Sequence, residues 1–381
     1  MKASLTLFER SLQLVRYPQH LQHPSWQAWD AADEYIIEYL HERPQLTQRG
    51  GLRIYNDDFG ALACWFASQQ PLWFSDSYVA YRACQLNLRA NQLDPGQVQC
   101  HSSLDKPAQS AELVLLKIPK TTALLEQQLI DLQQCVTAQT LVIAAGKANA
   151  IQKSTLALFE KYLGPTTTSL AKKKARLIFC QPTGALSHKS PYPTCWFTDK
   201  PRFEISNLAN VFSRQQLDIG ARFMLQHLPT TKGHSVIDLG CGNGVLGLHV
   251  LARDPEARIT FVDESHMALA SAATNIQQNV PDLVNNCDYV ISNCLDEYRA
   301  KADYPKVDFV LCNPPFHQQN TITDHIATQM FSDAKQVLKP GGSLIVVGNR
   351  HLDYPVKLKR LFRSVKQTAT NQKFSIFSAI K

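Results

Sequence analysis

The four residues Asn313-Pro314-Pro315-Phe316 suit methyl transfer to a planar amine. An exocyclic amine is a poor nucleophile because its lone pair is drawn into the ring that carries it. Oxygen acceptors on the Asn313 side chain and the Pro314 backbone would return electron density to the nitrogen and aim it at a methyl donor. The prolines stiffen the loop, and Phe316 offers a ring for base stacking, which is worth about 1–3 kcal/mol. We expect these four residues to be catalytic without a separate general base, since the amine can lose its proton after transfer.

A glycine-rich segment earlier in the chain predicts the site of a nucleoside cofactor. Gly240, Gly242 and Gly244 lie in the stretch 238–247, and they would let the backbone turn sharply and approach a ligand closely. This pattern alone also fits a dinucleotide. Asp238 favours S-adenosylmethionine, because a carboxylate would attract the ammonium group of that cofactor and repel a pyrophosphate.

Two further polar residues follow predicted strands. Asp263 stands where a carboxylate can accept hydrogen bonds from ribose hydroxyls, which both kinds of cofactor present. Asn293 follows the next strand, where it could meet the adenine edge or simply form a surface turn. The expected cofactor-binding residues of this half are Asp238, Gly240, Gly242, Asn243, Gly244, Asp263, Asn293 and Asn313.

The elements that must position these residues alternate between strand and helix. Apolar stretches at 234–238, 258–262, 288–291, 307–312, 343–347 and 373–380 predict strands. Residues 245–253 and 266–279 predict helices, and a helix of about 15 residues should end near the proline-glycine stop at 339–342. This order predicts an α/β fold with a mostly parallel seven-stranded sheet, helices on both faces and the ligand site at the carboxyl ends of the strands.

The first half repeats the pattern. Residues 53–67 parallel residues 235–248, and stretches starting at 74, 113 and 141 parallel those starting at 262, 309 and 344. The asparagine pair Asn87 and Asn91 matches Asn275 and Asn279. Four matches in one order predict a duplicated domain, although two unrelated α/β domains could share such a rhythm. A stretch rich in proline and serine at 181–200 predicts a linker, so we place the domains at 1–185 and 200–381.

The first copy lacks the residues of a cofactor site. Phe59-Gly60-Ala61-Leu62 stands in place of the glycines, and residues 117–120, Lys-Ile-Pro-Lys, stand in place of Asn-Pro-Pro-Phe. A lysine would be unfavourable beside a sulfonium cation. Basic residues of this copy could instead contact RNA phosphates, although charge runs are usually only solvated. The expected RNA-binding residues are Lys117, Lys120, Lys147, Lys172 and Lys173.

Composition limits the class of protein. A chain of 381 residues is too long for one ordinary core, and its net charge of +7 permits an RNA partner without requiring one. The ten cysteines form no C-x-x-C pair, so neither a zinc site nor a disulfide framework is expected. The first ten residues lack the pattern of a secretory signal, and no apolar run is long enough to span a bilayer. We expect a cytoplasmic protein without a metal.

On residues 210–222, 238–244 and 313–316 and the degenerate repeat, the chain resembles the bacterial ribosomal RNA guanine-N2 methyltransferases with two methyltransferase-like domains. The resemblance covers nearly the whole chain. It implies a Rossmann-like class I methyltransferase fold twice over, with S-adenosylmethionine and catalysis in the second copy and RNA recognition in the first. Phe212 and Asp218 match the segment that closes over the cofactor in such enzymes. The chain length and the segment 316–319 resemble 23S enzymes more than the 16S enzymes.

Other functions remain open at this point. A 16S guanine, an adenine amine or a protein glutamine also presents an sp² nitrogen with two hydrogens, although Phe316 and the tandem repeat favour guanine in RNA. A non-catalytic RNA-binding assembly factor is disfavoured, because Asp238, Gly242, Asp263 and Asn313 are all intact. Because the base must be unstacked, single-stranded or loop RNA is the easier substrate, and two domains in one chain suit a monomer.

Overall fold

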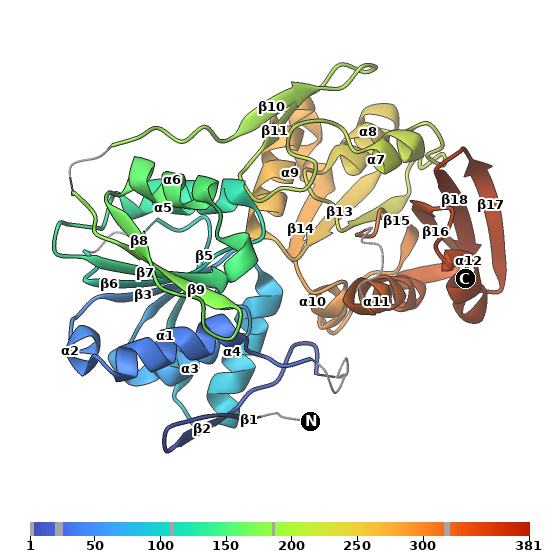
Figure 1. The fold of residues 1–381 in the computed structure, drawn as a ribbon. Coiled ribbons are helices and arrows are strands. Elements are labelled where there is room, and N and C mark those ends of the chain that lie inside the picture. The colour runs from blue at the N-terminus through green and yellow to red at the C-terminus, as the bar shows by residue number, and fades with distance from the viewer. Residues whose placement is uncertain (1–3, 20–25, 107–109, 185–186, 316–320) are drawn as a thin grey trace. The chain divides into compact units, whose positions relative to one another are not determined.

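The computed structural model describes residues 4–19, 26–106, 110–184, 187–315 and 321–381. The chain divides into two compact units, Met1–Pro191 and Tyr192–Lys381 (Figure 1). Each unit contains a seven-stranded sheet of its own.

The sheet of the C-terminal unit has the order β14-β13-β12-β15-β16-β18-β17. Its strands are β12 Ser235–Leu239, β13 Arg258–Asp263, β14 Cys287–Ile291, β15 Val307–Cys312, β16 Leu338–Asn349, β17 Ser364–Thr370 and β18 Phe374–Ile380. The first five strands in that order are parallel, and β18 is antiparallel to both of its neighbours. The carboxyl ends of β13, β12 and β15 are in register, with Leu239 opposite both Val262 and Cys312.

Helices cover both faces of this sheet. They are α7 Ile219–Leu225, α8 Val245–Arg253, α9 His266–Asn279, α10 Asp296–Arg299, α11 Thr321–Val337 and α12 Tyr354–Leu361. Apolar side chains of α7, α8 and α9 form one buried cluster against the strands, and those of α10, α11 and α12 form a second. The sheet is therefore buried on both faces, as its apolar strands require.

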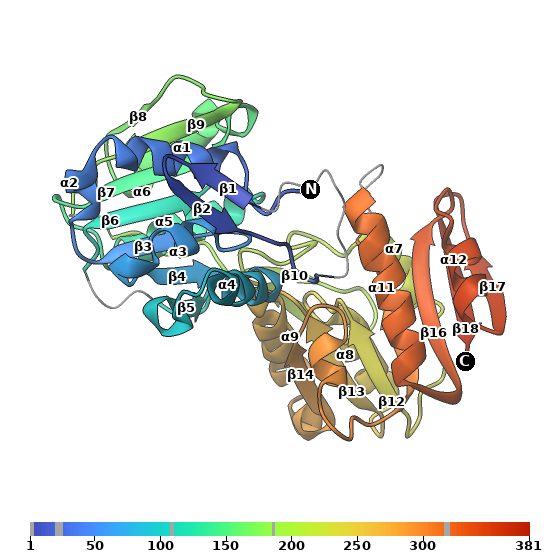
Figure 2. The same ribbon diagram turned by 90° about the horizontal axis from the view of Figure 1, so that it is seen from below.

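The N-terminal unit has the same topology, in the order β5-β4-β3-β6-β7-β9-β8, and Figure 2 shows these strands side by side. Its strands are β3 Leu52–Tyr55, β4 Leu72–Ser75, β5 Gln99–Ser102, β6 Leu113–Lys117, β7 Leu141–Lys147, β8 Thr166–Thr168 and β9 Ala175–Cys180. Its helices are α1 Ala31–His41, α2 Pro44–Thr47, α3 Ala61–Trp65, α4 Tyr78–Ala90, α5 Thr122–Leu132 and α6 Lys153–Tyr162. The predicted tandem α/β fold is confirmed.

Each unit also carries a β-hairpin, formed by β1 Ser4–Leu7 with β2 Arg10–Gln13, and by β10 Thr194–Phe197 with β11 Glu204–Asn207. Paired asparagines hold the two hairpins in the same way. The amides of Asn275 and Asn279 on α9 exchange hydrogen bonds with the backbone of Ser206 and Glu204. The amides of Asn87 on α4 and of Asn91, the C-cap of α4, do the same with the backbone of Val15 and Gln13. This shared anchor supports the duplication beyond a common strand order.

One local expectation was wrong. Residues 181–200 were predicted as a linker, but they contain strand β10. This strand has one face toward the core, where Trp196 packs, and one toward solvent, where Phe197 is 50% exposed. The helix expected to end near the proline-glycine stop at 339–342 is α11, which ends at Val337. The glycines at 341–342 already lie within β16, and a register shift between Val307 and Phe309 accommodates the early start of that strand.

Candidate active site

The loop between β12 and α8 presents bare backbone to open space. Gly240, Gly242 and Gly244 have φ values of +70°, +54° and +76°, in the left-handed region that favours glycine. A Cβ on Gly244 would lie 2.8 Å from the Cβ of Ala272, so the close approach of α8 and α9 requires glycine there. A Cβ on Gly242 would meet nothing within 4 Å. The loop is therefore shaped on one side by packing and left open on the other.

Two carboxylates hold this loop in place. Asp263 Oδ2 accepts a hydrogen bond from the Gly242 N–H at 2.9 Å, and its Oδ1 accepts one from the Ser265 N–H at 3.0 Å. Asp238 is 1% exposed, and its Oδ2 accepts from the Gly247 N–H at 3.0 Å. Burial raises the pKa of Asp238 to about 7. Asp238 thus organises the start of α8 from inside, and its pairing with the ammonium group of a cofactor stays a prediction.

Asn243 is also directed into the protein. It is 5% exposed, and its Nδ2 donates to Asn207 Oδ1 at 2.9 Å, while its backbone carbonyl accepts from Asn275. The side chain therefore ties the glycine loop to the hairpin strand β11. Asn207, which is fully buried, was not expected from the sequence, since nothing near it in the chain marks it as part of the site.

Asn313 follows β15 at the same edge of the sheet. Its Nδ2 donates to Asp218 Oδ2 at 3.2 Å. Its Oδ1 is buried and has no hydrogen-bond partner among the described residues. Pro314 is buried, Pro315 is exposed, and Phe316 lies outside the described residues. The loop thus holds an acceptor whose hydrogen-bonding capacity is unused.

The other residues predicted to bind the cofactor, Asp218, Phe212 and Asn293, range from exposed to buried. Asp218 is the N-cap of α7, and its Oδ2 accepts from the Ala221 N–H at 2.8 Å. Phe212, in the segment before α7, is 63% exposed. Asn293 is 8% exposed and donates to Asp296 Oδ2 at 2.8 Å, so its amide is used in the turn that leads into α10.

The N-terminal unit has a lysine at the position of Asn313. Residues Leu116 and Cys312 pair with equivalent positions on β3 and β12, which aligns Lys117 with Asn313. The Lys117 Nζ donates to Asp33 Oδ1 at 2.7 Å and to Asp30 Oδ1 at 3.0 Å.

Burial works against the charge of Lys117, but Asp33 and Asp30 outweigh it and hold the pKa of the lysine above its usual value. Lys117 is only 7% exposed. It is therefore not available to a phosphate, contrary to the expectation from the sequence.

The other four predicted RNA-binding lysines reach the surface. Lys172 and Lys173 form ion pairs with Glu38 at 2.8 Å and Glu34 at 2.6 Å, which offset their charge. Lys120 and Lys147 are exposed, and neither forms an ion pair with the described residues. These two lysines are the better candidates for phosphate contact.

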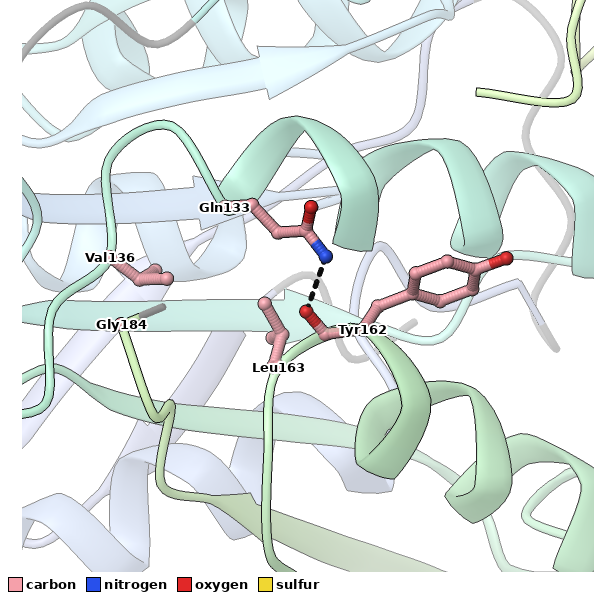
Figure 3. A pocket seen from close by; sticks show the side chains of 5 residues that line it. All are labelled: Gln133, Val136, Tyr162, Leu163 and Gly184. Carbon is pink, nitrogen blue, oxygen red and sulfur yellow. Dashed lines mark hydrogen bonds between the residues drawn. The ribbon is translucent and has the colours of Figure 1, made fainter. Parts of the chain in front are cut away.

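A small hollow in the N-terminal unit is lined by Gln133, Val136, Tyr162, Leu163 and Gly184 (Figure 3). The Gln133 Nε2 donates to the Tyr162 carbonyl at 2.6 Å, and its Oε1 accepts from the backbone of residue 188 at 2.9 Å. Since both ends of this amide are used within the protein, the hollow is a packing gap rather than a binding site. Among the described residues there is no cluster that could hold a metal ion, and no helix is long and apolar enough to cross a membrane.

Comparison with known proteins identifies the family. The RLMG N-terminal domain model matches residues 2–184, and the Methyltransferase small domain model matches residues 202–378. The ribosomal RNA large subunit methyltransferase G of Pseudoalteromonas atlantica is 62% identical over 100% of both chains. That of Aeromonas salmonicida is 55% identical over 97% of each chain. The chain belongs to the ribosomal RNA large subunit methyltransferase G family.

A solved structure agrees with the fold across both units. The T. thermophilus 16S rRNA N2 G1207 methyltransferase, in complex with AdoMet and guanosine, aligns with a TM-score of 0.73 over 100% of this chain and 99% of its own. At 18% identity this likeness shows the fold alone. Together with the family, it confirms that the chain is a methyltransferase with two tandem copies of a class I methyltransferase fold.

Proposed function

We propose that the C-terminal unit transfers the methyl group of S-adenosylmethionine to the exocyclic N2 amine of one guanine in 23S ribosomal RNA. The observation that carries this proposal is the buried Oδ1 of Asn313, which has no partner among the described residues and lies at the strand edge next to the glycine loop. The names of the full-length relatives support the large-subunit RNA as substrate. The AdoMet and guanosine in the T. thermophilus structure support the cofactor and the base.

The residues around the glycine loop fit this cofactor. The open side of Gly242 leaves room for a ligand against bare backbone. Asp263 holds Gly242 and Ser265 at the end of β13, and a carboxylate, with roughly four acceptor positions, can accept from ribose hydroxyls as well. When bound, S-adenosylmethionine supplies an electrophilic methyl group. Asp238, Asn243 and Asn293 act by shaping the loops, and the exposed Phe212 can cover the cofactor.

The amine is activated by acceptors rather than by a base. A buried polar atom without a partner costs about 1–3 kcal/mol, and a guanine N–H that reaches Asn313 Oδ1 removes that cost. In this proposal the Pro314 carbonyl accepts the second N–H, and Phe316, which lies outside the described residues, stacks on the base. The two hydrogen bonds, from the amine to Asn313 Oδ1 and to the Pro314 carbonyl, draw the nitrogen lone pair out of conjugation with the ring. The amine loses its extra proton after the methyl group has been transferred.

The N-terminal unit has a different role in this proposal. Its Lys117 occupies the position of the catalytic asparagine and is neutralised by Asp33 and Asp30, so the site is closed by an internal ion cluster. The exposed Lys120 and Lys147 then serve RNA recognition, in a monomer that acts in the cytoplasm.

Nucleoside mass spectrometry tests the proposal. Purified 23S and 16S RNA are compared between cells with the gene, cells without it, and cells that carry only the Asn313→Ala variant. We expect N2-methylguanosine to fall by one residue per 23S molecule in the second and third strains and to be unchanged in 16S RNA. A loss from 16S RNA, a loss of methyladenosine, unchanged N2-methylguanosine in cells without the gene, or full methylation by the variant would overturn the assignment.

A further inference from the structure

We propose that Asp218 is a positioning residue that decides which end of the Asn313 carboxamide faces the substrate amine. The proposal rests on the function above and names a residue that acts through Asn313. It starts from one contact, in which Asn313 Nδ2 donates to Asp218 Oδ2 at 3.2 Å, and from the absence of a described partner for Asn313 Oδ1.

The two ends of a carboxamide have nearly the same shape and opposite hydrogen-bonding character. A carboxylate oxygen only accepts hydrogen bonds, so the NH₂ end of Asn313 must be the end that faces Asp218. The oxygen is then left for the substrate. If the amide were turned over, its NH₂ group would confront the hydrogens of the guanine amine, and the lone pair of the nucleophile would not be released. Asp218 therefore selects the productive orientation.

Asp218 is itself held firmly. The same Oδ2 atom accepts the Ala221 N–H at 2.8 Å as the N-cap of α7. Helix α7 is anchored in turn by Ala221, Phe223 and Met224, which are buried in the core of the unit. Because α7 is fixed by its buried side chains, the Asp218 carboxylate at its N-terminus holds the Asn313 amide in a defined position.

The N-terminal copy supplies an independent observation. There Asp30 is the N-cap of α1, and its Oδ1 accepts from Lys117 at 3.0 Å. Lys117 occupies the position equivalent to Asn313. The contact between a helix N-cap and the end of the fourth core strand therefore belongs to the shared fold. In the C-terminal copy the same contact is made to the Asn313 amide, whose two ends differ in hydrogen bonding, so the contact fixes which end faces the substrate.

Two variants separate positioning from capping. Asparagine and serine cap helices about as well as aspartate, so Asp218→Asn and Asp218→Ser should leave the melting temperature unchanged. The amide introduced by Asp218→Asn could offer either of its ends to Asn313, and serine is too short to maintain the contact. We expect kcat to fall about 10- to 100-fold in both variants, while the KM for RNA stays within about twofold of wild type.

Asp254→Asn is the matched control. Asp254 also accepts hydrogen bonds at a turn of the same unit, from Thr231, and it follows the end of α8 that is remote from the glycine loop. Its replacement can lower the melting temperature but should leave kcat unchanged.

An exchange of the pair provides the decisive test. The single variant Asn313→Asp places two carboxylates in contact, at positions 218 and 313. Adding Asp218→Asn puts an amide at position 218, which can donate a hydrogen bond to the new carboxylate at position 313. We expect the double variant to be at least about fivefold more active than Asn313→Asp alone, because contacting residues are not additive. Wild-type kcat in Asp218→Asn, a loss of kcat that only follows the melting temperature, or no recovery in the double variant would overturn the positioning role. If the wild-type enzyme makes no N2-methylguanosine in 23S RNA, the proposed function fails instead.

Discussion

Replacing Asn313 by alanine removes the acceptor on which the proposed chemistry depends and changes little else. The side chain makes one described hydrogen bond, from Nδ2 to Asp218, and its Oδ1 makes none. The lost bond is worth about 0.5–1.5 kcal/mol, and removal of a buried unpaired oxygen returns about 1–3 kcal/mol. The free energy of unfolding of the C-terminal unit should therefore stay the same or rise slightly.

Catalysis should respond very differently. Loss of one preorganised hydrogen-bonding group aimed at developing charge, measured for donors at oxyanion holes, costs about 10²- to 10³-fold in kcat, or about 2.7–4 kcal/mol, and we expect a similar loss for this acceptor. Binding of S-adenosylmethionine should be unchanged, since the residues assigned to its ribose and to the glycine loop are intact.

Three measurements on the same preparation check this prediction. Single-turnover methyl transfer to unmodified 23S RNA gives the rate, calorimetry gives the cofactor affinity, and thermal unfolding gives the stability. A wild-type rate would refute the reasoning. So would a rate loss explained by weaker cofactor binding or by a lower melting temperature, because Asn313 would then act on the fold or the cofactor and not on the amine.

Three further predictions concern the residues that support the site. Asp263→Ala should weaken S-adenosylmethionine binding about tenfold or more by calorimetry, because Gly242 and the ribose both lose their acceptor. Lys117→Ala should lower the free energy of urea unfolding of the chain by about 3–5 kcal/mol, since it leaves two carboxylates without their buried partner. Asp238 has a pKa raised by burial to about 7, so the folded protein binds more protons than the unfolded chain between about pH 4 and pH 7. Its contribution to stability therefore falls as the pH rises through that range, by up to about 4 kcal/mol, and Asp238→Asn should flatten this dependence in urea unfolding measured at each pH.

For each of these three predictions, a specific outcome would contradict the role assigned to the residue. Unchanged cofactor affinity in Asp263→Ala would remove the ribose role. Lys172→Ala is the control for Lys117→Ala, because its ion pair is half exposed and worth about 0–1 kcal/mol, and equal losses in both variants would contradict the buried cluster. A pH dependence in Asp238→Asn that matches wild type would assign it to other groups.

Much of the fold could be predicted from the sequence. The strands that bear the site, the helices after them and the duplication all follow from apolar periodicity and from glycines and prolines that are close together in the chain. Strand β10 was missed because it is only four residues long and is flanked by prolines, so that nothing in its composition distinguishes it from a linker. Its place depends on Asn275 and Asn279, which hold its partner strand β11 from a helix far along the chain.

The chemistry of the site could be predicted from the sequence, because the glycine loop and the Asn-Pro-Pro loop are each a short run of neighbouring residues whose types restrict what they can do. How the key polar atoms are used became clear only from the folded protein. Asn313 meets Asp218 across 95 residues, and Lys117 meets Asp33 across 84. Local patterns carry no information about such pairings, since they arise when strand ends and helix starts converge at one edge of a folded sheet. The same convergence leaves Asn313 Oδ1 without a partner among the residues that the structure describes in one copy, and closes the other copy with an ion pair.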